Sequence, residues 1–243
     1  MVGVILAAGD GRRLKESVKE ACCKPLIKVK EKRLIEYALD NLIALDIRKV
    51  FIVVGKDGEI IKKVLGNKYK DLEIFYVVQT QQIGLINAFV QAIDVLGSDE
   101  TIIFQLSDEV FTDLKVADIK KCLQDREYDF YCGITFEDDA DKIRNNYSVY
   151  THDGNVISKC IEKPTEVTNN IKGTGFCIFN SEAVKVLNNK ENEKTVFLHD
   201  LCDYINYMIS NGKKGLALHI AEKEFNVNTF ADLFEVQSFL YVN

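Results

Sequence analysis

The residues with the clearest capacity for chemistry lie near the start of the chain. An apolar segment, Val4–Ala8, leads into a loop that contains Gly9 and Gly11, and Arg13 and Lys24 follow. Glycines let a backbone approach a ligand closely and turn its N–H groups toward it, while arginine and lysine supply positive charge. This pattern predicts a loop that binds the phosphates of a nucleoside triphosphate.

Two better-known phosphate loops fit this segment poorly. A dinucleotide-binding loop has the pattern G-x-G-x-x-G running directly into a helix. Here Gly9-Asp10-Gly11 lacks the third glycine, and helical periodicity begins only at Leu34. A Walker loop requires Gly-Lys-Ser/Thr, which this sequence does not contain. The segment therefore favours a different class of triphosphate loop.

Both prolines of the chain follow a lysine, which predicts further phosphate contacts. The pairs are Lys24-Pro25 and Lys163-Pro164. Because proline pushes the preceding residue into extended backbone, each pair presents its lysine on a constrained loop. We expect both lysines to contact phosphate groups of ligands; solvated surface loops are the alternative.

Gln79 and Gly84 lie between a predicted strand and a predicted helix. An amide side chain both donates and accepts hydrogen bonds, which suits the edge of a nucleobase. Glycine at position 84 would allow a base or sugar to lie close to the backbone. This segment is a candidate for base recognition.

A metal site is predicted from oxygen ligands at strand ends. Asp108 directly follows the strand-like segment Thr101–Leu106, and Mg²⁺ prefers one or two carboxylates together with phosphate oxygens. Asn228 is a candidate second ligand, although it could instead cap the terminal helix. We expect the neighbouring acids Glu109 and Asp113 to lie at the surface.

Alternating strands and helices must position these segments. The predicted strands are Val50–Val54, Glu73–Val78, Thr101–Leu106 and Asp129–Phe136, and the helices between them are Leu34–Leu45, Glu59–Leu65, Gly84–Leu96 and Val116–Leu123. Such alternation indicates a parallel sheet covered by helices on both faces. Ligands bind at the carboxyl ends of such strands.

The pattern changes in the second half of the chain. A hairpin is predicted over Tyr147–Thr151 and Val156–Ile161, strands at Gly175–Phe179 and Gly215–Ile220, and helices at Glu182–Leu187, Val196–Ser210 and Ala231–Val242. We therefore predict one catalytic domain over residues 1–243. Its expected α/β fold is Rossmann-like and three-layered, with a mixed, mainly parallel central sheet and a small antiparallel subregion.

Composition narrows the class of protein. A net charge of −6 and a pI near 5.3 argue against a nucleic-acid-binding surface. No apolar segment approaches the roughly 20 residues of a membrane span, and we expect neither a membrane partner nor a signal peptide. The seven cysteines form no C-x-x-C pattern, so we expect reduced thiols in a cytoplasmic protein.

The motifs together resemble those of the sugar-phosphate nucleotidyltransferases, which include glucose-1-phosphate thymidylyltransferases and uridylyltransferases. The similar segments are Leu6–Leu14 (L-A-A-G-x-G-x-R-L), Lys24–Leu26 (K-P-L), Gln79–Ala88 (Q-x4-G-L-x-x-A), Glu162–Pro164 (E-K-P) and the glycine-rich Gly173–Gly175, with Asp108 and Asn228 at the metal-binding positions. The resemblance extends from Leu6 to about Leu233.

The resemblance implies a mechanism and a set of site residues. A phosphate oxygen of a sugar-1-phosphate would attack the α-phosphorus of a nucleoside triphosphate in line and expel pyrophosphate. The resemblance implies that Leu6, Ala8, Gly9, Gly11, Arg13, Gln79 and Gly84 bind the nucleotide. It implies that Arg13, Lys24 and Asp108 are catalytic and that Asp108 and Asn228 bind Mg²⁺. It also implies that Glu162, Lys163 and Gly175 bind the acceptor. The antiparallel subregion would bind the sugar. The sequence does not decide whether the chain forms a homo-oligomer.

Some positions depart from the family pattern and keep other functions open. Ser107 and Ser148 stand where the family often has glycine, and the segment after Arg13 lacks the family's proline. We expect a serine at either position to add a side chain near the ligands. We expect a pyrimidine triphosphate, with UTP or dTTP preferred over CTP. The alternatives are a cytidylyltransferase with a non-sugar phosphate ester as acceptor, and a catalytically silent protein that binds a nucleotide sugar.

Overall fold

A ten-stranded mixed sheet forms the centre of the computed structural model, which describes residues 1–9, 11, 13–14, 23–80, 83–125, 127–188 and 198–242. In spatial order its strands are β10 (Tyr147–His152), β11 (Val156–Glu162), β13 (Gly215–His219), β9 (Phe130–Phe136), β12 (Ile171–Phe179), β7 (Ile102–Leu106), β1 (Val2–Ala7), β4 (Lys49–Val54), β6 (Leu72–Val78) and β5 (Lys68–Tyr69). The mixed α/β fold expected from the sequence is confirmed. The expectation that the sheet is mainly parallel is wrong, because four of its nine neighbouring strand pairs are parallel and five are antiparallel.

Parallel pairing is concentrated in the first half of the chain. Strands β7, β1, β4 and β6 pair in parallel, as do β9 and β13. Strand β12 is antiparallel to both of its neighbours β7 and β9, and β10 and β11 form the predicted antiparallel hairpin. The carboxyl ends of β1, β6 and β7 therefore lie at one edge of the sheet.

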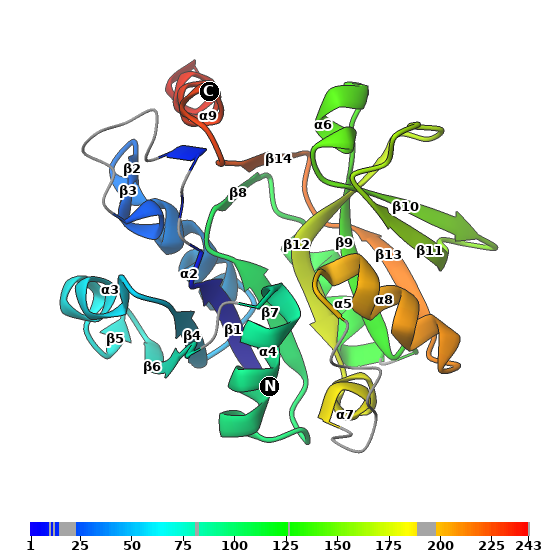
Figure 1. Cartoon of the computed structure of the whole chain (residues 1–243), viewed down its shortest axis with the longest axis horizontal. Coiled ribbons are helices and arrows are strands. Elements are labelled where there is room, and N and C mark those ends of the chain that lie inside the picture. Colours follow the sequence, from blue (N-terminus) through cyan, green and yellow to red (C-terminus); the bar gives the residue numbers. More distant parts are fainter. Residues whose placement is uncertain are drawn as a thin grey trace.

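Helices cover both faces of the sheet (Figure 1). On one face lie α4 (Leu85–Leu96), α7 (Ser181–Asn188) and α8 (Leu201–Ser210), and on the other lie α2 (Leu34–Ala44), α3 (Gly58–Leu65) and α5 (Val116–Asp125). Alternate side chains of β1 enter the two cores: Val4 and Leu6 pack under α4, and Ile5 and Ala7 pack under α2. This period of two is the one expected for a strand buried on both faces.

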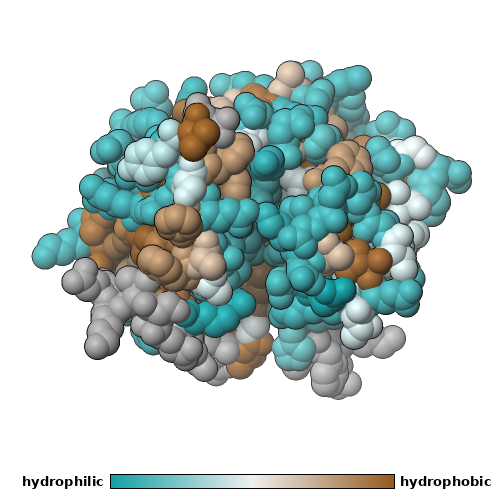
Figure 2. Space-filling model, turned by 90° about the horizontal axis from the view of Figure 1, so that it is seen from above, coloured by the Kyte–Doolittle hydropathy of each residue, from teal (hydrophilic) through white to brown (hydrophobic). Residues whose placement is uncertain are grey.

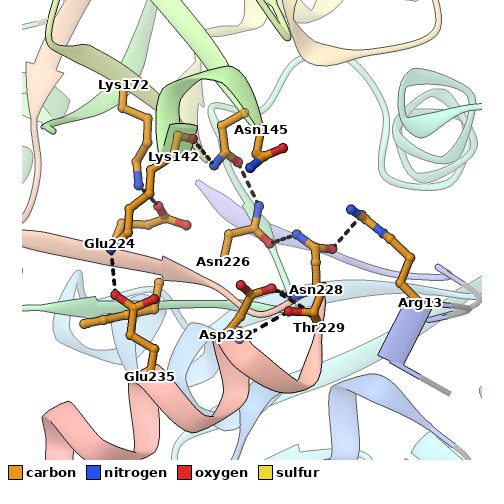
Figure 3. Close-up of a pocket in the computed structure, with 12 residues that line it drawn as sticks. Arg13, Lys142, Asn145, Lys172, Glu224, Asn226, Asn228, Thr229, Asp232 and Glu235 are labelled. Carbon is orange, nitrogen blue, oxygen red and sulfur yellow. Dashed lines mark hydrogen bonds and ion pairs between the residues drawn. The ribbon is translucent and has the colours of Figure 1, made fainter. Parts of the chain in front are cut away.

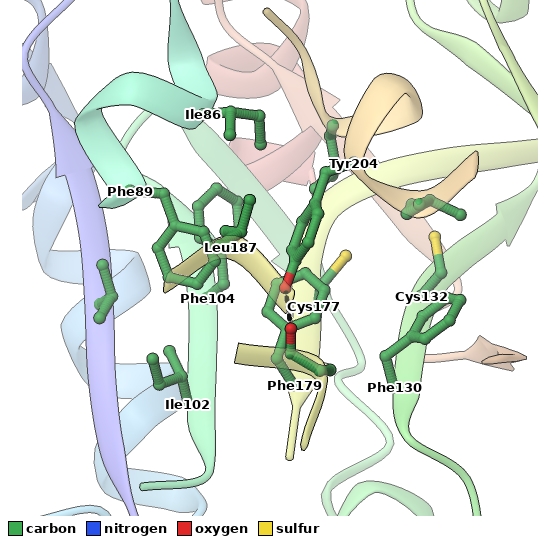
Figure 4. Packing of buried hydrophobic residues seen from close by; sticks show 14 of the residues in the cluster. Ile86, Phe89, Ile102, Phe104, Phe130, Cys132, Cys177, Phe179, Leu187 and Tyr204 are labelled. Carbon is green, nitrogen blue, oxygen red and sulfur yellow. Dashed lines mark hydrogen bonds between the residues drawn. The ribbon is translucent and has the colours of Figure 1, made fainter. Parts of the chain in front are cut away.

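Aromatic rings fill the core beneath α4 and α8 (Figure 4). The ring of Phe89 meets that of Phe104 edge-on at 5.0 Å between centroids, and Phe179 lies 5.1 Å from Tyr204. The buried Tyr204 hydroxyl donates to the carbonyl oxygen of Ala183 at 2.6 Å, so its polar end is satisfied. This cluster fixes α4, whose first turn reaches the strand ends.

A separate small core holds the C-terminal helix α9 (Phe230–Val242). Strands β8 (Glu109–Thr112) and β14 (Lys223–Asn226) pair antiparallel, and α9 packs on them together with the hairpin β2 (Lys28–Val29) and β3 (Lys32–Arg33). The sequence did not predict β8 and β14, because their pairing joins segments more than 100 residues apart. This pair carries the loop with Asn228 to the strand ends of the first half.

Other boundaries differ from the prediction in smaller ways. The short helices η1 (Lys24–Leu26) and α6 (Ala140–Arg144) were not predicted. Helix α8 begins at Leu201 because the Asp200 carboxylate accepts a hydrogen bond from the N–H of Asp203, a helix cap; the predicted start at Val196 lies outside the described residues. Among the residues described, no helix is both long and apolar enough to cross a membrane.

The end of the molecule that carries α6 and α9 is largely polar. Figure 2 looks onto this end and shows a mostly hydrophilic surface with separate apolar patches. Helix α6 lies across from α9 at this end (Figure 1). Polar side chains from both helices line a pocket between them.

Candidate functional site

A pocket of about 610 Å³ lies at the carboxyl ends of β1, β6 and β7. Its lining includes all ten residues predicted for nucleotide, catalysis and metal: Leu6, Ala8, Gly9, Gly11, Arg13, Lys24, Gln79, Gly84, Asp108 and Asn228. These residues come from five separate segments of the chain. The structure thus brings them together, as expected for residues that follow neighbouring parallel strands.

Lys24 stands at the centre of this pocket. Its ammonium group donates to the Asp108 carboxylate and, at 2.9 Å, to Asn228 Oδ1. The Lys24 side chain is 10% exposed and that of Asp108 is 21% exposed, so the ion pair is largely shielded from water. Arg13 Nη2 donates to the same Asn228 oxygen at 3.1 Å. Asp108 and Asn228 therefore aim oxygen atoms at one shared cation position.

The backbone at Asn228 is held by the first turn of α9. The N–H groups of Asn228 and Thr229 donate to Asp232 Oδ2 at 2.8 and 2.7 Å. The Asp232 N–H in turn donates to Thr229 Oγ1 at 3.3 Å, so Thr229 caps the helix. The alternative in which Asn228 is the cap is therefore wrong, and its side chain points into the pocket instead.

Two glycines are required by the geometry of the pocket wall. Gly84 has φ +131°, and a Cβ there would lie 2.9 Å from the carbonyl oxygen of His199. Gly11 has φ +60°, and a Cβ there would lie 3.1 Å from Cβ of Lys24. Any other residue would be strained at either position. Glycine at 84 lets the start of α4 lie directly against the backbone at His199, whose oxygen accepts from the Leu85 N–H at 2.9 Å.

A short chain of amides fixes the orientation of Gln79. The backbone N–H of Thr80 donates to Gln91 Oε1 at 3.2 Å, and Gln91 Nε2 donates to Asn87 Oδ1 at 2.7 Å. Gln79 Nε2 donates weakly to Asn87 Oδ1 and to the Gly84 carbonyl oxygen, at 3.5 and 3.4 Å. Since a backbone N–H can only donate, the Thr80 N–H fixes which end of the Gln91 amide accepts, and the later amides follow in turn. Gln79 therefore uses its Nε2 in these contacts, and its Oε1 is the end left to accept a hydrogen bond.

The predicted acceptor-binding residues Glu162 and Lys163 lie outside this pocket. They end β11, with Lys163 Nζ 3.3 Å from Glu162 Oε1, and the Lys163 side chain is 68% exposed. Burial, and next the negative charge of Asp200, raise the pKa of the Glu162 carboxyl. The carboxylates of Glu162 and Asp200 and the thiol of Cys202 have polar atoms within 4.8 Å of one another.

Gly175 lies beneath the pocket. Its N–H donates to both carboxyl oxygens of Glu109, at 2.8 and 2.9 Å, and a Cβ at Gly175 would lie 2.4 Å from Leu106 Cγ. Leu106 lines the pocket, so Gly175 supports its floor. The expectation that Glu109 is a surface acid is wrong, because the β8–β14 pair covers it, leaving it 2% exposed. Asp113 is exposed, as predicted.

The two serines that depart from the family pattern have different surroundings. Ser107 lines the pocket, whereas Ser148 is buried and its hydroxyl donates to Asn169 Oδ1 at 2.8 Å. Ser148 does not line the pocket. Of the two serines, Ser107 is therefore the one that lies at this pocket, and Ser148 lies in the β10–β11 hairpin. Gln82, which lies between Gln79 and Gly84 in the sequence and could orient the Gln79 amide, lies outside the described residues.

Sequence reasoning missed a second, polar pocket beside the first (Figure 3). Its volume is about 180 Å³, and it shares Arg13 and Asn228 with the first pocket. The remaining lining comes from α6 and the turn that follows it, from β12, β14 and the start of α9, and it includes Asn145, Asn146 and Asn226. The asparagine-rich segments around these positions were the only signal in the sequence.

Comparison with known proteins decides the family. The family model described as Nucleotidyl transferase matches residues 2–241. The chain belongs to this family. Over 179 residues it is 31% identical to the UTP–glucose-1-phosphate uridylyltransferase AglF of Haloferax volcanii, covering 74% of this chain and 72% of that protein. The resemblance to sugar-1-phosphate nucleotidyltransferases inferred from the motifs is thereby confirmed.

Other nucleotidyl transferases are similar over part or all of the chain. The low-salt glycan biosynthesis nucleotidyltransferase Agl11 of the same organism is 30% identical over 74% of this chain, which spans 49% of that longer protein. A crystal structure described as a glucose-1-phosphate thymidylyltransferase from Bacillus anthracis with sucrose superposes with a TM-score of 0.84 at 21% identity, covering 98% and 95% of the two chains. A UDP-glucose pyrophosphorylase with UDP-glucose gives 0.80 at 18% identity, covering 99% and 98%. These two structures establish the shared fold.

Proposed function

We propose that this nucleotidyl transferase couples a nucleoside triphosphate to a sugar-1-phosphate and releases pyrophosphate. The observation that carries the proposal is the convergence of a glycine-rich loop, two cationic side chains and two oxygen ligands in one pocket. A single catalytic domain over residues 1–243 is consistent with the family match over 2–241. The partners would be the triphosphate and a small phosphorylated acceptor.

The triphosphate would lie along the loop that follows β1. The loop residues Gly9, Gly11 and Arg13 line the pocket, and Arg13 would bind phosphate oxygens beyond the α-phosphorus. Lys24 would exchange its contact with Asp108 for one with the α-phosphate, where charge grows during in-line attack. In this role the protein supplies position and charge, and no covalent intermediate on the protein is required.

The residues present fit a divalent cation. Asp108 and Asn228 already direct a carboxylate oxygen and an amide oxygen to one cationic group, and such oxygens are the ligands that Mg²⁺ prefers. Asp108 and Asn228 would hold the ion, which would neutralise charge on triphosphate and acceptor oxygens. Lys24 would then leave this position and turn to the α-phosphate.

The acceptor would bind between the pocket and the β10–β11 hairpin. Lys163 is largely exposed and free to reach a phosphate, and Glu162 could accept hydrogen bonds from sugar hydroxyls. Gly175, which was expected to bind the acceptor, would act by supporting the floor at Leu106. The antiparallel hairpin would then serve as the sugar-binding subregion.

The orientation of Gln79 supports a preference for UTP or dTTP. Its Oε1 would accept from the N3–H of uracil or thymine, whereas N3 of cytosine is itself an acceptor and would be left facing it. Gln79 is 8% exposed, so two acceptors that face each other there would both lack a hydrogen bond. A buried site with such a mismatch discriminates strongly against the ligand that causes it, which here is CTP. UTP or dTTP is therefore favoured over CTP.

Pyrophosphate release tests this function directly. UTP, dTTP, CTP, GTP and ATP would each be combined with several sugar-1-phosphates and with phosphocholine, in Mg²⁺ buffer, with Asp108→Ala as the inactive control. We expect the fastest release with UTP or dTTP and a sugar-1-phosphate, slower release with CTP, and poor release with GTP and ATP. Release with CTP and a non-sugar ester would establish the cytidylyltransferase alternative, and binding of nucleotide sugar without turnover would establish a silent protein.

A further inference from the structure

Three asparagine side chains form a continuous hydrogen-bonded chain from the second pocket to the first (Figure 3). Asn146 Nδ2 donates to the carbonyl oxygen of Lys142 at 3.0 Å. Asn226 Nδ2 donates to Asn146 Oδ1 at 3.0 Å, and Asn228 Nδ2 donates to Asn226 Oδ1 at 2.7 Å. The residues follow α6, end β14 and precede α9, so the chain joins three separate elements.

The direction of this chain is set by its first member. A backbone carbonyl oxygen can only accept, so the amide nitrogen of Asn146 must face Lys142. The oxygen of Asn146 then faces Asn226, and the oxygen of Asn226 faces Asn228. The result is that Asn228 turns its nitrogen away from the first pocket and its oxygen toward Lys24.

We propose that Asn226 and Asn146 are positioning residues that hold the Asn228 oxygen toward the cation site. This inference rests on the proposed function, in which Asn228 is a metal ligand. Asp232 already fixes the backbone of Asn228, so the side-chain amide of Asn228 is the part that can still rotate. Asn226 removes that freedom.

The opposite rotation of Asn228 would be incompatible with the site. Lys24 Nζ and Arg13 Nη2 both donate to Asn228 Oδ1, at 2.9 and 3.1 Å. A turned amide would point its N–H₂ group at these two cations and at any metal ion on Asp108. Groups that orient a metal ligand in this way commonly change metal affinity ten- to a hundredfold when they are removed.

The test uses Mn²⁺ as the probe, titrated into the full-length protein without nucleotide and followed by loss of its free electron paramagnetic resonance signal. Asn226→Leu removes both hydrogen bonds, whereas Asn226→Asp keeps an acceptor for Asn228 Nδ2. Asn145→Ala is the matched control, because Asn145 lines the same pocket, is exposed and takes no part in the chain. Thermal unfolding of each variant reports its folding, and Asn146→Leu breaks the next link if Asn226→Leu does not fold.

We expect Asn226→Leu to weaken Mn²⁺ binding about tenfold or more, and Asn226→Asp and Asn145→Ala to bind at least as tightly as wild type. A purely structural role would lower the melting temperature of both Asn226 variants without separating their Mn²⁺ affinities. Unchanged Mn²⁺ binding in folded Asn226→Leu, or equal weakening in Asn226→Asp, would overturn the inference and leave the proposed function intact. Wild-type protein that binds no Mn²⁺ would overturn both the inference and the proposed metal site.

Discussion

The residues proposed to bind nucleotide and those proposed to bind the acceptor differ in how far the free protein organises them. Lys24, Asp108 and Asn228 are bonded to one another in a shielded pocket. The side chain of Lys163 is 68% exposed, and its Nζ lies 3.3 Å from Oε1 of its neighbour Glu162. We call the residues that line this pocket the nucleotide half, and Glu162 with Lys163 the acceptor half.

The difference follows from the elements that carry the two halves. The nucleotide half is carried mainly by ends of parallel strands in the middle of the sheet, which must converge at one edge. The acceptor half ends β11, a hairpin strand near the far edge of the sheet. Preorganised groups stabilise a transition state without reorganisation, so we expect the nucleotide half to govern turnover and the acceptor half to govern acceptor affinity.

Removing the carboxylate of Asp108 should give the largest effect. A catalytic metal contributes several kcal/mol to transition-state stabilisation, and each ~1.4 kcal/mol is tenfold in rate. We expect Asp108→Ala to lower turnover by roughly 10³-fold with the fold intact, and Asp108→Asn to be severe as well because an amide lacks the charge. Near wild-type turnover of either variant, measured by pyrophosphate release, would remove Asp108 from the mechanism.

Replacing Lys24 should separate its two roles. We expect Lys24→Ala to lower kcat by roughly 10²-fold, because its charge is needed most at the reacting α-phosphorus. The same variant should bind Mn²⁺ more tightly in the free state, since the ammonium group no longer occupies the position between Asp108 and Asn228. Mn²⁺ titration and steady-state kinetics on one preparation measure both effects. Weaker Mn²⁺ binding would show that Lys24 supports the site instead of competing for it.

Gln79→Leu should reduce discrimination between bases. Loss of the amide leaves the base edge unpaired at a cost of about 1–3 kcal/mol, which is roughly ten- to hundredfold in kcat/KM for UTP or dTTP. The ratio of kcat/KM for UTP to that for CTP is the measurement, with Gln91→Leu as a second variant that removes the support of Asn87 and the acceptor of the Thr80 N–H but keeps Gln79. A ratio that Gln79→Leu leaves unchanged would place base recognition elsewhere.

A smaller effect is expected from Lys163, because exposed charges are screened by solvent. Lys163→Ala should raise the acceptor KM about tenfold while the triphosphate KM stays within twofold. Initial rates over a grid of both substrate concentrations separate the two constants. An effect on the triphosphate KM instead would mean that Lys163 belongs to the nucleotide half.

The smallest effect concerns the pH dependence of acceptor binding. Since burial and Asp200 raise the pKa of Glu162, this carboxyl takes up its proton at a higher pH than an ordinary glutamate. We expect the acceptor KM to rise a few-fold as the pH falls through that pKa, and Glu162→Gln to flatten the profile. For the same reason Glu162 contributes less to the free energy of unfolding as the pH rises through its folded-state pKa. A profile identical in Glu162→Gln would assign the dependence to another group.

The sequence was sufficient to predict pocket residues whose position depends only on the strand that they directly follow. Gly9, Gln79 and Asp108 each follow an apolar strand, and parallel strands bring their carboxyl ends together without further information. The burial of Glu109 was missed because its cover is β14, more than 100 residues away. The contact between Asn146 and Asn226 was missed for the same reason, since 80 residues separate them. Long-range pairing, rather than local propensity, determined these parts of the site.

The central claim is that the nucleotide half is complete in the free protein. Calorimetric titration of the wild-type protein with UTP or dTTP in Mg²⁺ buffer, without any acceptor, tests it most directly. We expect saturable binding at one site, with the same dissociation constant for Lys163→Ala and markedly weaker binding for Asp108→Ala. Triphosphate binding that requires a sugar-1-phosphate, or that is lost in Lys163→Ala, would show that the nucleotide half is incomplete without the acceptor.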